Sequence, residues 1–205
     1  MAETKEMKII NSDPTPLGVF GLAMITLVAA SAKLGWTDGT TYAMTWALFL
    51  GSIGQIWAAK IDFKRNNFYG AIVLGSFGLF WAAVALTWAI SNGFLGDVPA
   101  NADLKQFGYA CLGYMVFSIF FAVASWEVNK VFGTILTLIV VLLGALGLSL
   151  LGIAPAVTGP IAGWTELAIS ILGFYAAGAL FLNGFFGRVL LPLGKPMGWL
   201  KKTVS

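Results

Sequence analysis

Charged side chains are absent from six long segments of this chain, and that absence constrains the fold more than any other feature. The segments free of Asp, Glu, Lys and Arg are Thr15–Ala32, Thr41–Ala59, Asn66–Gly96, Gln106–Trp126, Val131–Thr165 and Leu167–Gly187. Each is at least as long as the roughly 17–25 residues that a helix needs to cross the hydrocarbon core of a bilayer. Barrel strands would alternate polar and apolar residues, so uninterrupted apolar segments indicate helices. We therefore predict an all-α integral membrane protein with six transmembrane helices.

The composition agrees with a chain that folds in lipid. The sequence is 59% hydrophobic and 10% charged, whereas a soluble globular domain carries about 25% charged residues. We expect one transmembrane domain over residues 15–190, between an N-terminal segment (1–14) and a C-terminal tail (191–205).

The basic residues predict the orientation, because Lys and Arg concentrate in cytoplasmic loops. A cytoplasmic N-terminus leaves only Lys33 and Lys105 outside, so that ten of the twelve Lys and Arg residues lie inside. The inside set is Lys5, Lys8, Lys60, Lys64, Arg65, Lys130, Arg188, Lys195, Lys201 and Lys202. We thus place both termini in the cytoplasm and the protein in the cell membrane, with Trp199 and the two lysines after it as an interfacial tail.

The first segment also permits a second interpretation, as a secretory signal. Lys5 and Lys8 precede an apolar stretch that ends in the small residues Ala30–Ala32, which is the pattern of a cleaved signal. Three acidic residues dilute the basic region, however, and Thr15 with Pro16 is a good N-cap and first-turn pair for a permanent helix. We favour the permanent helix, and intact mass would decide between the two.

Several classes of chemistry are excluded by what the chain lacks. It contains no His, and Cys111 is its single cysteine, which excludes an intrachain disulfide, structural zinc and haem with an axial His. No catalytic triad, phosphate-binding glycine loop or paired-carboxylate site occurs. We expect a protein that is not an enzyme, uses no cofactor or metal, and binds lipid rather than nucleic acid.

Small residues at helical spacing predict how the helices pack. Two matching rows are Ala47, Gly51, Gly54, Ala58 and Ala71, Gly75, Gly78, Ala82. We expect these two faces to meet, because small residues allow close approach of helices in lipid; some of them could instead line a narrow pore. Ser170, Gly173 and Ala177 form a similar line with Glu166 at the mouth of the last helix.

Polar residues within the six segments are few. Gln55 and Asn183 are the conspicuous amides, and each could serve a pore or a contact between helices. Because no Asp, Glu, Lys or Arg lies within a segment, a permeating solute would be small and would be bound by hydrogen-bond donors and helix ends. The start of the first helix, Thr15–Gly18, provides one such positive end.

Five segments, in order along the chain, resemble the acetate uptake transporter family of the GPR1/FUN34/YaaH type. They are Asp13–Gly18, Gly51–Gln55, Lys64–Gly70, Ser76–Trp81 and Leu182–Gly194. The resemblance implies a plasma-membrane channel or transporter for acetate and related short monocarboxylates, with succinate a further candidate substrate. It also implies a homo-hexamer with a separate pathway through each protomer.

The resemblance further implies an apolar constriction at Leu22, Phe77 and Ile139, where the family has Phe, Tyr and Leu. Two motif positions depart from the family pattern. Asp13 stands where an Asn is usual in the motif Asp13, Pro14, Thr15, Pro16, Leu17, Gly18, and Gly184 stands where Leu-Asn-Glu has its Glu.

We assign candidate roles on this basis. Leu22, Phe77 and Ile139 would favour small, dehydrated or protonated solutes. Gln55, Asn67 and Asn183 would donate to carboxylate oxygens or brace helix ends, and an N-cap role is the favoured interpretation for Asn67. Two alternatives stay open: a channel for a small neutral solute such as ammonia or urea, and a membrane scaffold that transports nothing.

Overall fold

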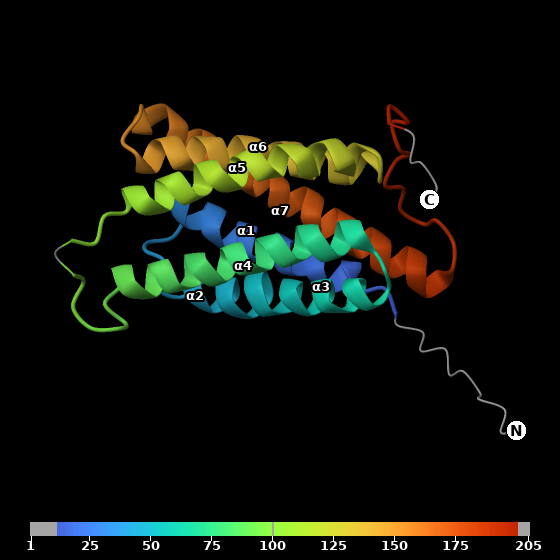
Figure 1. The fold of residues 1–205 in the computed structure, drawn as a ribbon, viewed down its shortest axis with the longest axis horizontal. Helices are drawn as coiled ribbons and strands as arrows, with labels where there is room; N and C mark the ends of the chain where they lie inside the picture. Colours follow the sequence, from blue (N-terminus) through green and yellow to red (C-terminus); the bar gives the residue numbers. More distant parts are fainter. Residues whose placement is uncertain (1–11, 100, 201–205) are drawn as a thin grey trace, which may run out of the picture.

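The computed structural model describes residues 12–99 and 101–200, and all regular structure in this part of the chain is helical (Figure 1). The predicted all-α class is therefore confirmed. The elements are α1 (Thr15–Lys33), α2 (Ala43–Trp46), the π-helix η1 (Ala47–Gly54), α3 (Gln55–Lys64), α4 (Phe68–Ser91), α5 (Lys105–Trp126), α6 (Lys130–Leu150) and α7 (Pro155–Phe186).

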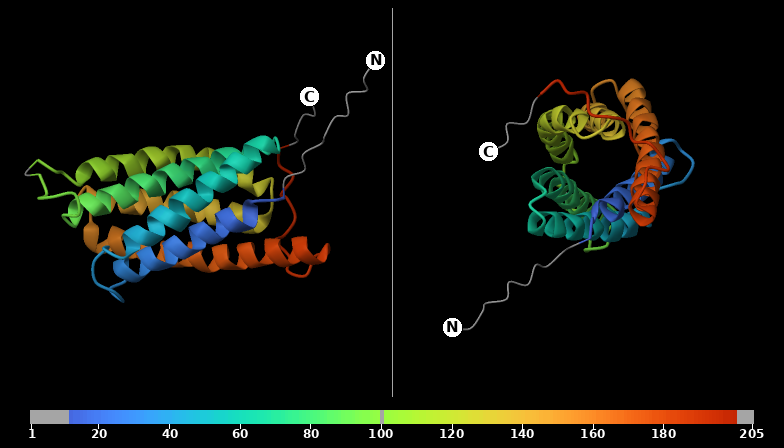
Figure 2. Two further views of the ribbon diagram at one scale, coloured as in Figure 1. Left: turned by 90° about the horizontal axis from the view of Figure 1, so that it is seen from below. Right: turned by 90° about the vertical axis from the view of Figure 1, so that its right-hand side faces the viewer.

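The helices run along one axis and form a ring when viewed down it (Figure 2). Around the ring, α4 packs on η1 and α3, and these two helices pack on α1. The ring continues from α1 to α7, then to α6 and finally to α5, each helix packing on the next. The backbones of α4 and α5 approach each other least closely, and side chains such as Phe77 and Phe121 bridge the two helices where the ring closes. Buried side chains from all sides of the ring form one main core cluster.

Five helices in the described part are each long and apolar enough to cross a membrane: α1, α4, α5, α6 and α7. The second uncharged segment forms α2, η1 and α3, which follow one another without a break from Ala43 to Lys64. The π-helical turn lies where this rod crosses α1. A Cβ on Gly21 of α1 would collide with the carbonyl oxygen of Leu50, so glycine is required for this close approach.

The boundary that we expected between the last two segments is wrong. We placed it at Glu166, but α6 ends at Leu150 and α7 runs without a break from Pro155 to Phe186. Pro155 begins the helix, where the missing N–H costs no hydrogen bond, whereas Pro160 lies inside it and does not end it. Glu166 is tolerated within the helix because its carboxylate is paired, as described below.

The start of α1 also differs from the expectation. Thr15 is the first helical residue and Pro14 is the N-cap, so the predicted Thr15 cap is wrong. The Asp13 carboxylate takes over the capping role, since its Oδ1 accepts from the backbone N–H of Thr15 at 3.1 Å and from the Thr15 hydroxyl at 2.6 Å. The N-cap role of Asn67 is confirmed, because its side chain accepts from the N–H of Gly70 at 3.3 Å.

The helices that carry the two rows of small residues do pack on each other, but the glycines of the rows mostly meet larger neighbours rather than the opposite row. A Cβ on Gly78 of α4 would lie 3.2 Å from the carbonyl oxygen of Ser52, and one on Gly51 would lie 3.0 Å from Cβ of Trp81. Gly75 faces Ala59. The glycines thus allow α4 to pack tightly on η1 and α3.

The start of α1, the α3–α4 turn, the α5–α6 turn and the segment after α7 lie at the same end of the bundle (Figure 1). Lys33 and Lys105, at the end of α1 and the start of α5, lie at the opposite end. Trp199 lies at the same end as the start of α1, where its ring centroid is 6.3 Å from that of Trp126. Lys5, Lys8, Lys201 and Lys202, which entered the orientation argument, lie outside the described residues.

Candidate functional site

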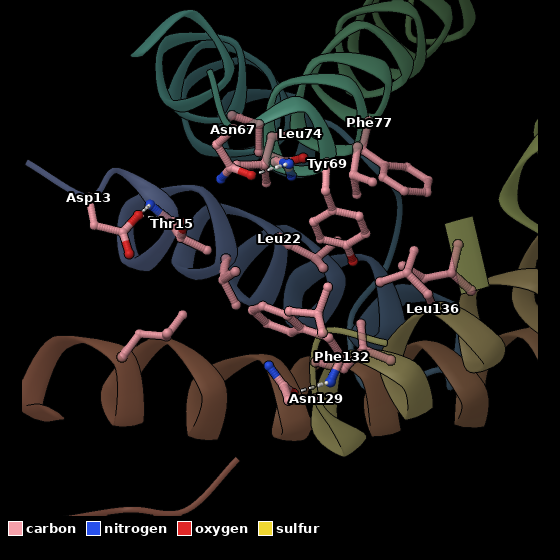
Figure 3. Close-up of a pocket in the computed structure, with 18 of the residues that line it drawn as sticks. Asp13, Thr15, Leu22, Asn67, Tyr69, Leu74, Phe77, Asn129, Phe132 and Leu136 are labelled. Carbon is pink, nitrogen blue, oxygen red and sulfur yellow. Dashed lines mark hydrogen bonds between the residues drawn. The ribbon is translucent and has the colours of Figure 1, made fainter. Parts of the chain in front are cut away.

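A cavity of about 430 Å³ occupies the interior of the bundle at the end where α1 begins. Side chains of α1, α4 and α6 point into it, as Figure 3 shows for Leu22, Tyr69, Phe77 and Phe132. Seven of the twelve predicted site residues line it: Asp13, Thr15, Leu22, Gln55, Asn67, Phe77 and Ile139.

The inner wall of the cavity is apolar and is built by regular helical spacing. On α4 the lining residues Tyr69, Val73 and Phe77 recur every four residues and share one face. The facing stripe on α6 consists of Phe132, Ile135, Leu136 and Ile139. Apart from the Tyr69 hydroxyl, these side chains carry no polar atoms, so the inner wall offers few partners for an ion.

The three residues of the expected constriction are part of the lining of the cavity. Phe77 and Ile139 are each 4% exposed, and Leu22 packs against the same core cluster. The ring of Phe77 is held edge-on by Phe121 of α5, with the ring centroids 5.9 Å apart. This contact fixes the orientation of Phe77 and limits how far its ring can turn aside.

Gln55 is the polar residue of this wall with an unmet hydrogen-bonding capacity. It is 1% exposed, and its Nε2 has no hydrogen-bond partner in the described part of the chain. Leaving a buried amide donor unpaired costs about 1–3 kcal/mol. Gln55 follows directly on η1, and π-helical turns are frequent at functional sites.

The other polar groups at the cavity are already engaged. The Tyr69 hydroxyl hydrogen-bonds to Ser125 of α5. Asn129 caps α6, since its Oδ1 accepts from the N–H of Phe132 at 2.9 Å (Figure 3). Asn67 caps α4 in the same way. These residues shape the cavity and keep two helix starts paired.

Three charged groups lie together where the cavity opens. Nη1 of Arg65 lies 2.8 Å from Oδ1 of Asp13 and 3.4 Å from Oδ1 of the buried Asp62. Burial raises the pKa of Asp13, but hydrogen bonds from Thr15 and Arg65 outweigh burial and lower that pKa below its ordinary value of 3.8. The predicted positive end of α1 is thus already occupied by a carboxylate, which corrects its expected role as a free anion site.

The remaining predicted residues do not line the cavity: Pro14, Pro16, Leu17, Gly18 and Asn183. Gly18 packs against Leu74 of α4. Asn183 braces the segment after α7, because its Oδ1 accepts from the backbone N–H groups of Leu190 and Leu191 at 2.7 and 3.0 Å. Of the two jobs considered for Asn183, the structure gives it the bracing one.

Sequence reasoning missed most of the other residues that line the cavity, among them Tyr69, Asn129 and Phe132. The four-residue spacing of Tyr69, Val73 and Phe77 was the available signal. Asn129 and Phe132 gave no comparable signal, because their position follows from how α6 packs across the ring.

The expectation that no charged residue lies within a membrane helix is also wrong. Glu166 lies inside the long apolar helix α7 and is 2% exposed. Oε2 of Glu166 lies 2.7 Å from Nζ of Lys33, at the end of α1. This pair could not be predicted from the sequence, because 132 residues lie between Lys33 and Glu166 and because Glu166 falls between two uncharged segments.

Comparison with known proteins gives consistent results. A family model described as the GPR1/FUN34/yaaH family matches residues 2–192. The chain is 30% identical over 187 residues to a protein of Escherichia coli (strain K12) named succinate-acetate/proton symporter SatP, covering 90% of this chain and 96% of that protein. It is 28% identical over 129 residues to the acetate transporter protein patA of Aspergillus clavatus, covering 60% of this chain and 51% of that one.

A solved structure shares the fold. The structure described as that of the bacterial acetate channel SatP aligns with a TM-score of 0.82 at 25% sequence identity. The alignment covers 90% of this chain and 100% of that one. The arrangement of the helices is therefore one that this chain has in common with the structure of that channel.

Proposed function

The chain belongs to the GPR1/FUN34/yaaH family, and we propose that it is a membrane channel or transporter for acetate and related short monocarboxylates, with succinate a further candidate. The observation that carries this proposal is the 430 Å³ cavity inside the bundle, which has an apolar inner wall and one unpartnered amide. The names of the related proteins, an acetate transporter and a succinate-acetate/proton symporter, support the choice of substrate.

The cavity suits a small carboxylic acid. Nε2 of Gln55 supplies a donor for a carboxyl oxygen, and Leu22, Phe77 and Ile139 provide an apolar constriction beyond it. An unpaired carboxylate moved into low dielectric faces an idealised penalty on the order of 20 kcal/mol. The neutral acid avoids most of this penalty, so the protonated form is the species that passes the constriction.

The proposed topology has six membrane crossings with both termini in the cytoplasm. The continuous rod of α2, η1 and α3 supplies the sixth crossing beside the five long apolar helices. The start of α1 and the segment after α7 lie on the same side as Lys64, Arg65 and Lys130, and the basic-inside tendency makes this side cytoplasmic. The mouth of the 430 Å³ cavity then faces the cytoplasm.

We further propose that the protein is a homo-hexamer in the cell membrane, that each protomer has its own pathway, and that it is neither an enzyme nor dependent on a cofactor. The hexamer follows from the family resemblance. One surface suited to contacts between protomers or with lipid is α5, where Val116, Phe117, Ile119 and Phe120 are exposed. Native mass spectrometry of the detergent-solubilised protein measures the number of protomers.

Uptake of radiolabelled acetate into proteoliposomes tests the function, with unlabelled propionate, succinate and urea as competitors and empty liposomes as the control. We expect acetate uptake that propionate competes and urea does not. Uptake of labelled urea without acetate uptake would establish the neutral-solute channel instead. Absence of flux for every solute would leave a scaffold without transport activity.

A further inference from the structure

The buried ion pair between Lys33 and Glu166 lies on the far side of the apolar constriction. Nζ of Lys33 is 2.7 Å from Oε2 of Glu166, and the two side chains are 21% and 2% exposed. A buried ion pair is weak evidence for stability, since well-packed apolar residues of similar volume often do as well or better. Its presence inside a membrane helix calls for a functional explanation.

The pair lines a second, smaller cavity of about 40 Å³. On α4 the lining passes from Phe77 of the larger cavity to Phe80 of the smaller one, and on α6 from Ile139 to Leu142. Three residues of helix advance about 4.5 Å. The two cavities are therefore stacked end to end along the same helix faces, about one turn apart.

A second, independent feature of the small cavity is an unpaired donor. Trp81 of α4 lines it and is 5% exposed, and its indole Nε1 has no hydrogen-bond partner in the described part of the chain. A Trp N–H that is buried normally finds an acceptor. The volume of 40 Å³ has room for about three water-sized groups, at roughly 10–15 Å³ each. A carboxyl group fits these dimensions.

We propose that Lys33 and Glu166 form a carboxylate-exchange site, at which the carboxylate of the substrate replaces that of Glu166 as the partner of the Lys33 ammonium. This inference rests on the proposed function, since it assigns a second binding site to the same pathway. Lys33 has three N–H donors, of which Glu166 uses one. The indole N–H of Trp81 completes the donors for an incoming carboxyl group.

The site stays neutral throughout the exchange. The substrate reaches the pair as the neutral acid, its O–H bond breaks, and the proton moves to a carboxylate oxygen of Glu166. The carboxylate formed in this way pairs with Nζ of Lys33, and the reverse transfer regenerates the neutral acid. One negative and one positive charge are present before and after the step, so no net charge is added to a low-dielectric site. A third titratable group, the thiol of Cys111 on α5, is within electrostatic range of both charges.

The decisive variant is the apolar double substitution Lys33→Met with Glu166→Leu. It removes both charges together, so neither is left unpaired, and a purely structural pair would be replaced without loss. We expect the variant to fold, as judged by thermal unfolding in detergent, and to lose acetate uptake by about tenfold or more at low acetate concentration, because charge-assisted hydrogen bonds to the substrate are gone. Lys105→Met, at the exposed start of α5, is the matched control and leaves uptake unchanged.

A second variant, Glu166→Gln, keeps the cation and removes the proton acceptor. We expect a lower half-saturating acetate concentration together with a lower maximal rate, because the substrate is held on an ammonium without a competing carboxylate. Two results would overturn the exchange site while wild-type uptake upheld the proposed function: unchanged kinetics in the folded double variant, or a lower maximal rate of Glu166→Gln with an unchanged or higher half-saturating acetate concentration. If the wild-type protein takes up no acetate, the proposed function fails, and the exchange site fails with it.

Discussion

Replacement of Gln55 by Leu is the most informative single substitution, because stability and transport should change in opposite directions. The side chain is almost fully buried on the wall of the large cavity, and its Nε2 lacks a partner in the described residues. If the amide binds the carboxyl group of the substrate, then its N–H donor is buried and unpaired in the substrate-free protein, which lowers the stability of that state. Leu has a similar volume and no polar atoms, so it removes that cost.

The expected magnitudes follow from the same atom. A buried unsatisfied donor costs about 1–3 kcal/mol, so we expect Gln55→Leu to raise the free energy of unfolding of the substrate-free protein by an amount in this range. For a chain of this length, about 1 kcal/mol corresponds to a shift of roughly 2–4 °C in Tm. Loss of one hydrogen bond to the bound carboxyl group should weaken acetate binding by roughly tenfold.

Two measurements on the same preparation test this reasoning. Thermal unfolding in detergent is recorded with and without acetate, and uptake is measured in proteoliposomes over a range of acetate concentrations. Gln106→Leu, at an exposed position at the start of α5, is the control that should change neither. A less stable Gln55→Leu protein with normal uptake would show that the amide has a structural partner and no role with substrate.

Three further substitutions test other parts of the structure. Phe77→Ala should widen the constriction and let larger acids compete for acetate uptake. Leu79→Ala, at an outward-facing position, is the control and should leave selectivity unchanged. Equal selectivity in the two variants would show that Phe77 is not part of the constriction. Gly21→Ala should destabilise the fold by about 1–3 kcal/mol, because the added methyl group collides with a backbone carbonyl of η1. Gly178→Ala is the control: the space around Gly178 is open, so this substitution should raise the Tm or leave it unchanged. The pKa of Asp13 is lowered because hydrogen bonds and its ion pair outweigh burial; its stabilising contribution is therefore present above pH 3.8 and is lost as the pH falls through the lower folded value. Asp13→Asn should flatten the fall of Tm in acid, and an unchanged acid profile would contradict the assigned pair.

The fold was largely predictable because membrane helices are defined by what they exclude. Uncharged length located α1, α4 and α5 within a few residues, and the small-residue rows identified the contact of α4 with η1 and α3. The same rule failed at Glu166, where a charge inside a helix was mistaken for a boundary. Hydropathy treats each charge alone, whereas its cost depends on a partner, here Lys33, that only the folded chain brings near.

Site residues that belong to a sequence motif could be predicted, whereas site residues whose position depends on helix packing could not. Leu22, Phe77 and Ile139 were located by resemblance, and all three line the cavity, although their role in selectivity stays a prediction. Asn129 and Phe132 were missed because their place at the cavity depends on how α6 packs between α5 and α7. Conversely, Asn183 stands in a recognisable motif but serves the segment after α7, since a motif marks a required residue without stating its task.

The charge and polarity of the side chains change along the proposed pathway, and this order favours the neutral acid over its anion. At the mouth, Asp13 and the buried Asp62 both pair with Arg65, so this cation is not free to bind an arriving anion. The apolar wall then penalises any charge, and Glu166 beyond it can accept a proton. The neutral acid passes all three zones, so uptake should follow its concentration and fall about tenfold for each pH unit above the pKa of the acid. Measuring initial acetate uptake at fixed total acetate over a series of pH values tests this, with membrane current recorded in parallel. A rate that is independent of pH and accompanied by current would show that the anion itself is conducted and that the constriction stabilises charge.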